Sequence, residues 1–165
     1  MKRAGLVVLA IVSMLMQVSL LPALRPLGVV PNLALVIVTL IGLEGTASMA
    51  LTTAVAGGVV LDLASGANFG LWTAMLVLAA LVGGLVHRAG IELGGPTVAL
   101  VIVAIGTAIE TAVIVLGVAG SANLSAGVIA GRLIAELVLN LVLTVMLTPL
   151  VRRLVPDQTA SGEIG

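Results

Sequence analysis

Residues 96–117 read PTVALVIVAIGTAIETAVIVLG, an apolar run in which Glu110 is the only charged residue. The hydrocarbon core of a bilayer is about 30 Å thick, so a spanning helix needs about 20 apolar residues. A proline suits the first turn of such a helix, where no backbone donor is lost. The run therefore predicts a transmembrane helix that begins at Pro96 and carries an acidic side chain near mid-membrane.

The composition of the whole chain agrees with this prediction. Its 165 residues are 61% hydrophobic and 8% charged, whereas a soluble domain carries about 25% charged residues. We therefore expect an integral membrane protein and not an apolar soluble bundle. The net charge of zero gives no reason to expect nucleic acid as a partner.

Charges, prolines and glycine clusters divide the apolar sequence into segments of helix length. We predict an all-α integral membrane protein, a bundle of about six transmembrane helices. A single polytopic membrane domain covers residues 1–155, and a short disordered cytoplasmic tail covers 156–165. The Lys2-Arg3 start is similar to a signal sequence, but the apolar run is long and lacks an A-x-A site, so we expect an uncleaved first helix. The predicted helices are Ala4–Leu24, Pro31–Leu43, Thr46–Ala64, Phe69–Val86, Pro96–Gly117 and Gly127–Val151.

The second predicted helix, Pro31–Leu43, is short for a complete span at about 1.5 Å per residue. It could extend back towards Leu27, bend, or form half of a re-entrant hairpin with the third helix. A re-entrant segment has to be covered by protein, because lipid cannot satisfy exposed backbone groups.

The positions of the cations predict the orientation, since Lys and Arg concentrate in short cytoplasmic loops. With the N-terminus inside, the outer side holds only Arg25 and Arg132. Both termini are therefore expected to be cytoplasmic, with Phe69 and Trp72 at the outer interface. The cations on the cytoplasmic side are Lys2, Arg3, Arg88, Arg152 and Arg153.

Four ionisable residues lie inside otherwise apolar segments: Asp62, Glu110, Arg132 and Glu136. A charge at the bilayer centre costs roughly 2.5–3.5 kcal/mol on insertion scales, so such residues pair, line a polar cavity or contact a partner. Polar residues also recur every fourth position of the last predicted helix, which predicts one polar stripe that faces the bundle or forms a groove for a partner or a lipid headgroup. The stripe consists of Arg132, Glu136, Asn140, Thr144 and Thr148.

The predicted orientation places Asp62, Arg132 and Glu136 in the outer half of the membrane. One cation at this depth can interact with both carboxylates. We predict an Asp62–Arg132 bridge between helices and a local Arg132–Glu136 pair. Together with Asn140 and Glu110, these residues form a predicted polar clasp that binds helices or a partner. Glu110 has no local cation, so we expect it to be neutral or hydrogen-bonded to another helix.

Glycines recur at positions suited to close helix contact, because small residues let helix backbones approach each other. We predict helix packing at Gly57-Gly58, at Gly83-Gly84, and at Gly127 with Gly131. His87 and Arg88 end the fourth predicted helix, where cations are favourable, and are interpreted as an anchor at the cytoplasmic face.

Patterns of catalysis and metal binding are missing from the sequence. There is no Cys, His87 is the only His, and H-E-x-x-H, G-x-S-x-G and P-loop motifs do not occur. The sequence therefore predicts no enzymatic activity, no catalytic residue, no cofactor and no metal site.

The most distinctive stretch is GGVVLDLASGANFGL at residues 57–71, preceded by PNL at residues 31–33. Together they resemble the rod-shape-determining MreD family. That family shows a Pro-Asp start to its second helix, a Gly-rich third helix that ends in a Leu-x-Asp-x-x-Ser/Gly turn, and a Gly-Leu start to the next helix. Asn32 departs from the family's Asp but keeps an acceptor for capping the helix. The motif turn residues are Pro31, Asn32, Ser65, Gly66 and Gly70.

The resemblance implies a non-enzymatic scaffold in the bacterial inner membrane, within the complex that elongates the cell wall and maintains rod shape. Its implied partners are an MreC-like membrane protein and, indirectly, an MreB-like filament and the peptidoglycan glycosyltransferase–transpeptidase pair. The family is also similar in architecture to the substrate-binding subunits of energy-coupling-factor transporters. A substrate-binding subunit of a vitamin transporter is therefore the alternative function.

Overall fold

The computed structural model describes residues 2–20, 29–66, 69–90, 95–118 and 125–155, and no strand occurs among them. The all-α prediction is confirmed for this part of the chain, and the helix bounds within it lie close to the predicted ones. The predicted end of the first helix at Leu24, Arg25 and the predicted tail 156–165 lie outside the described residues. The helices are α1 (Lys2–Leu15) with its π-helical continuation η1 (Met16–Leu20), α2 (Leu33–Glu44), α3 (Ala47–Ser65), α4 (Leu71–Arg88), α5 (Gly95–Val118) and α6 (Ala126–Leu154).

Four of these helices, α3 to α6, are long and apolar enough to cross a membrane. The first two contribute shorter apolar stretches, Val8–Ser19 and Leu33–Glu44. The chain therefore has the helices of a multi-pass membrane protein, with four candidate spans in its described part.

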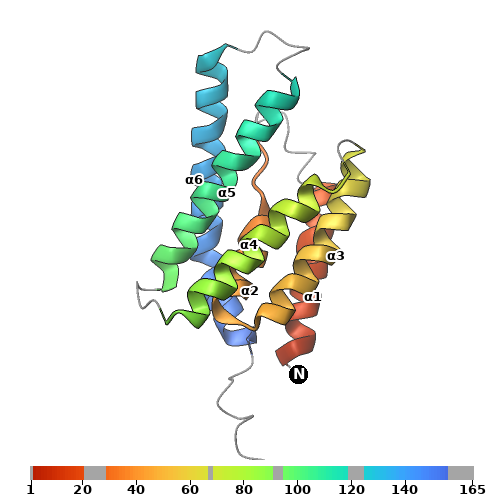
Figure 1. Ribbon diagram of the computed structural model, residues 1–165, viewed down its shortest axis with the longest axis vertical. Helices are drawn as coiled ribbons and strands as arrows, with labels where there is room; N and C mark the ends of the chain where they lie inside the picture. Colours follow the sequence, from red (N-terminus) through yellow and green to blue (C-terminus); the bar gives the residue numbers. More distant parts are fainter. Residues whose placement is uncertain (1, 21–28, 67–68, 91–94, 119–124, 156–165) are drawn as a thin grey trace, which may run out of the picture.

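The short helix α2 lies at the centre of the bundle (Figure 1). All residues from 34 to 42 are buried, and α2 packs against α1, α3, α4, α5 and α6. This burial explains why α2 is apolar on every side. Its 12 residues extend about 18 Å, less than the hydrocarbon core. Protein covers it on all sides, as a segment that enters the membrane without crossing it requires.

The turn between α3 and α4 shows why the motif contains glycines. Gly66 (φ 63°) ends α3 and Gly70 (φ 97°) precedes α4, both in the left-handed region. A Cβ at either position would meet nothing within 4 Å. Backbone conformation, and not close packing, therefore requires glycine at these two motif positions.

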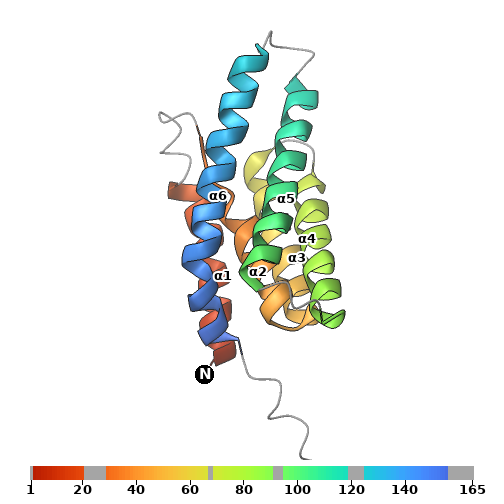
Figure 2. The same ribbon diagram turned by 90° about the vertical axis from the view of Figure 1, so that its left-hand side faces the viewer.

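Close helix packing accounts for another set of glycines, as predicted. A Cβ on Gly58 would lie 2.3 Å from Thr73 Cα, and a Cβ on Gly42 would lie 3.3 Å from Gly83 Cα. These contacts bring α3 against α4 and α2 against α4. The prediction is wrong for Gly127 and Gly131, because a Cβ on either would meet nothing within 4 Å. Both lie in the part of α6 that extends, with α5, beyond the ends of α3 and α4 (Figure 2).

Several helix ends that carry Lys or Arg lie at the same end of the bundle. The N-terminus, the α2–α3 turn, the end of α4 and the end of α6 all lie at this end (Figure 1). The chain positions of the five cations that the sequence assigned to one side of the membrane therefore lie at one end of the bundle. They are Lys2, Arg3, Arg88, Arg152 and Arg153.

Candidate functional site

A buried hydrogen-bond network begins at Asn32, the residue that caps α2. Its Oδ1 accepts a hydrogen bond from Leu35 N at 2.9 Å, and its Nδ2 donates to Glu110 Oε2 at 2.7 Å. The backbone N–H of Asn32 donates to Asn140 Oδ1 at 2.7 Å. Asn32 is completely buried, so these bonds replace the water that an exposed helix start would use.

The network extends into α5 and η1. Asn140 Nδ2 donates to Thr107 Oγ1 at 2.9 Å, and Thr107 donates in turn to the Val103 carbonyl. From the other side, Gln17 Oε1 accepts from Leu33 N at 2.9 Å. Polar side chains from η1, α5 and α6 thus converge on the first turn of α2. They satisfy backbone donors that would otherwise be buried unpaired inside the membrane.

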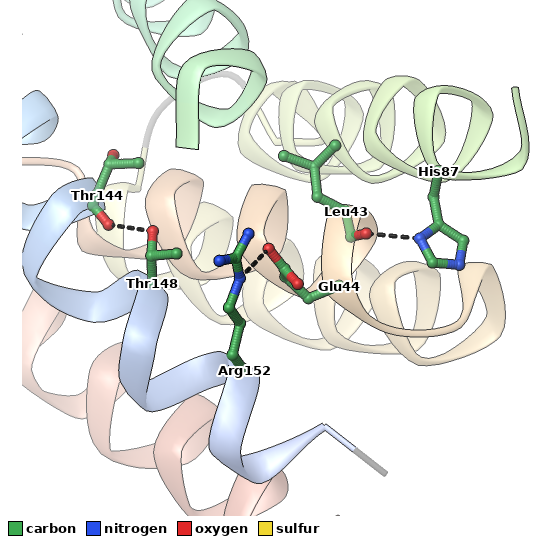
Figure 3. A network of polar contacts seen from close by, with 6 residues as sticks. All are labelled: Leu43, Glu44, His87, Thr144, Thr148 and Arg152. Atoms are coloured by element: carbon green, nitrogen blue, oxygen red, sulfur yellow. Dashed lines mark hydrogen bonds and ion pairs between the residues drawn. The ribbon is translucent and has the colours of Figure 1, made fainter. Parts of the chain in front are cut away.

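The prediction for Glu110 is confirmed, because this residue hydrogen-bonds an amide from another helix. The polar stripe of α6 also faces the bundle, since Glu136, Asn140, Thr144 and Thr148 are all buried. The two threonine hydroxyls donate to carbonyls four residues earlier, Thr144 to Asn140 and Thr148 to Thr144 (Figure 3).

Asp62 does not pair with Arg132, so the predicted bridge between helices is wrong. Asp62 Oδ1 accepts from Trp72 N at 2.9 Å, and Oδ2 accepts from Thr73 N at 3.2 Å and from Thr73 Oγ1 at 2.6 Å. The tight α3–α4 turn brings the carboxylate to the first turn of α4. There the carboxylate accepts hydrogen bonds from N–H groups that have no partner within the helix. Its negative charge is also stabilised by the positive end of the α4 dipole.

Arg132 lies on the exposed side of α6 and forms no hydrogen bond or ion pair with any described residue. Glu136, one turn further, is only 3% exposed. The two attract each other electrostatically but are not in contact, so the predicted local pair is also not formed. The rotation of α6 explains this outcome, because it turns Glu136 into the bundle and leaves Arg132 at its edge.

A second polar cluster lies at the opposite end of the bundle (Figure 3). Arg152 Nε contacts Glu44 Oε1 at 2.8 Å, and His87 Nδ1 donates to the Leu43 carbonyl at 2.6 Å. The His87 bond satisfies a carbonyl at the C-terminus of α2, where carbonyl groups lack helical partners. The Arg152 contact joins the side chain of the last residue of α2 to α6. The sequence did not predict these contacts, which join residues 44 and 108 positions apart.

The chemistry available to these clusters is limited. No group of three or more His, Cys, Asp or Glu residues that could hold a metal ion occurs in the described ranges. The groups of the Asn32 network donate to and accept from each other at every connection. This arrangement is suited to fixing helices in place.

An apolar cavity of about 150 Å³ lies between α4 and α5, with Leu35 of α2 on its wall. Its other lining residues include Met75, Ile102 and Gly106, and none of the lining side chains is polar. Pockets that recognise small molecules combine apolar walls with a few convergent polar groups. The residues that line this cavity include no such polar group.

No family model, curated protein or solved structure matches the chain. The resemblance to the MreD family therefore depends on the residues at 31–33 and 57–71 alone.

Proposed function

We propose that the protein is a non-enzymatic membrane scaffold of the cell-wall elongation complex, which docks the transmembrane helix of an MreC-like partner. The motif that resembles the MreD family supports this proposal. Its residues have structural tasks, since Asn32 caps α2, Asp62 caps α4, and Gly66 and Gly70 form the turn between α3 and α4. A motif of this kind specifies a framework, so the partner contact is expected elsewhere.

The observation that carries the proposal is the open face of α6, defined by Gly127, Gly131, Arg132 and the exposed side chains of Val128, Ile134 and Val138. Two glycines four residues apart let a second membrane helix approach closely. The space beside both glycines contains no described atom within 4 Å. The face therefore has the geometry of a helix contact without a contacting helix.

Arg132 adds polarity to the open face. A cation within a membrane-spanning segment is costly unless it pairs or reaches the polar surface. Arg132 forms no ion pair with the described residues, so a partner helix with an acceptor at this depth would satisfy it. This feature supports a specific partner over general contact with lipid.

The alternative, a vitamin-transporter subunit, has weaker support. The cavity between α4 and α5 lacks polar lining residues, and the polar groups near α2 lie outside its lining. Recognition of a vitamin requires polar groups that converge on the ligand.

Co-purification with the MreC-like protein encoded in the same genome tests the proposal. Gly131→Leu fills the open face without touching the bundle and is expected to abolish recovery of the partner, and Arg132→Ala is expected to reduce it. The matched control is Ala74→Leu, which introduces the same side chain at an exposed position on α4. Melting temperatures of all variants should stay near that of the unmodified protein.

Undiminished recovery with both Gly131→Leu and Arg132→Ala would refute the proposal. If Gly131→Leu instead converts a dimer of this protein into monomers while the partner is still recovered, the open face binds a second copy, which also contradicts it.

A further inference from the structure

The hydrogen bond between Thr107 and Asn140 fixes the register of two antiparallel helices. α5 and α6 run side by side in opposite directions (Figures 1 and 2). Thr111 lies four residues after Thr107, and Glu136 lies four residues before Asn140. Both are therefore one helical turn from the hydrogen bond, in the same direction and on the same faces. This register brings Thr111 and Glu136 opposite each other, with Glu110 beside them.

These three residues have oxygen atoms without partners. Thr111 Oγ1 is buried and makes no hydrogen bond. Glu136 is 3% exposed and receives no hydrogen bond from the described chain. Glu110 uses Oε2 for Asn32, and no described residue bonds its Oε1. Buried polar groups in proteins are nearly always paired, so this concentration of unpaired oxygens requires an explanation.

With both carboxyls ionised, the charges around these oxygens do not balance. Glu110 and Glu136 repel each other, and Arg132 attracts both without contacting either. When all three are ionised, their sum is one negative charge. One additional positive charge balances them, which favours a monovalent ion over a divalent one.

We propose that Glu110, Thr111 and Glu136 form a binding site for a small monovalent cation, Na⁺, between α5 and α6. Carboxylate and hydroxyl oxygens are the ligands that hard cations take. The burial of all three side chains leaves no access for the body of an organic amine. The three proposed ligands are buried, whereas the open face of α6 consists of exposed residues. Arg132, which attracts both carboxylates, lies at the boundary between the two. Cation binding would hold together the part of α5 and α6 that extends beyond α3 and α4.

Binding of ²²Na⁺ to the full-length protein in nanodiscs of neutral lipid tests the site directly. We expect saturable binding, and a melting temperature that rises with NaCl but not with N-methylglucamine chloride of equal ionic strength, because a ligand of the folded state stabilises it. Glu136→Gln and Thr111→Val should each weaken Na⁺ binding at least tenfold. Thr111→Val keeps the side-chain shape and removes only an unpaired hydroxyl, so it tests the site without disturbing the fold.

Glu44→Gln is the matched control, because it removes a carboxylate at the opposite end of the bundle and should leave Na⁺ affinity unchanged. Absence of saturable binding, or equal binding by Glu136→Gln and Thr111→Val, would overturn the proposal. An equal rise in melting temperature with both salts would indicate an ionic-strength effect and would also overturn it. Stabilisation by acid alone, lost in Glu136→Gln, would show that a proton takes the place assigned to Na⁺.

Discussion

Asn32 Nδ2 donates a 2.7 Å hydrogen bond to Glu110 Oε2, although the two residues are 78 positions apart in the sequence. This bond ties the buried start of α2 to the middle of α5. The same amide group caps α2 through its oxygen. An ionised aspartate at this position could act as the cap but could not donate to Glu110. Asn32 and the acid at position 110 therefore form a complementary pair.

Exchanging the two functional groups tests this pair. Asn32→Asp alone removes the donor and places two acids together, which should lower the free energy of unfolding by about 1–3 kcal/mol. Adding Glu110→Gln supplies an amide donor from the other side and should recover at least half of the loss. Unfolding by SDS in mixed micelles, followed by circular dichroism, measures both. A double variant that loses the sum of the two single effects would contradict the pairing.

Substitutions of Asp62 test whether its carboxylate caps α4 or forms an ion pair with Arg132. Asp62→Ala leaves the first N–H groups of α4 without their acceptor and should cost about 1–3 kcal/mol, whereas Asp62→Asn keeps an acceptor and should cost less. Arg132→Ala should cost less than Asp62→Ala, because Arg132 forms no hydrogen bond or ion pair with any described residue. The same unfolding assay compares the three variants, and equal losses for Asp62→Ala and Arg132→Ala would restore the bridge between these residues.

Two glycines of similar sequence context should respond in opposite ways to alanine. Gly58→Ala places a Cβ 2.3 Å from Thr73 Cα, so α3 and α4 must separate and the protein should lose about 1–3 kcal/mol. Gly131→Ala meets no atom and should leave the stability unchanged or raise it by up to about 1 kcal/mol, because alanine favours helix. Melting temperatures in detergent test this. A comparable loss for both variants would show that α6 is packed at Gly131.

The Glu44–Arg152 contact should contribute little to stability. The two side chains are 20% and 46% exposed, and ion pairs in such surroundings are worth about 0–1 kcal/mol. A double-mutant cycle with Glu44→Ala and Arg152→Ala should give a coupling energy below about 1 kcal/mol, decreasing as salt is added. A larger coupling that does not respond to salt would show that this end of the bundle is shielded from solvent.

The sequence by itself determined where the helices begin and end. Apolar runs fix their lengths because lipid excludes unpaired backbone, and the breaks at Gly66 and Gly70 mark the turn. It also predicted that Glu110 would be either neutral or hydrogen-bonded to another helix, since an isolated charge inside the membrane is costly, and the structure shows the hydrogen bond. These properties depend on local composition, which a linear sequence displays directly.

Only the tertiary structure decided which side chains meet. Depth in the membrane placed Asp62 and Arg132 at one level, yet the α3–α4 turn gives Asp62 to the start of α4. Likewise, the rotation of α6 turns Glu136 inward and leaves Gly131 open. Hydropathy reports how far along the membrane normal a residue lies. The partner of a polar group depends on how each helix is rotated about its own axis, and this is set by packing among all the helices at once.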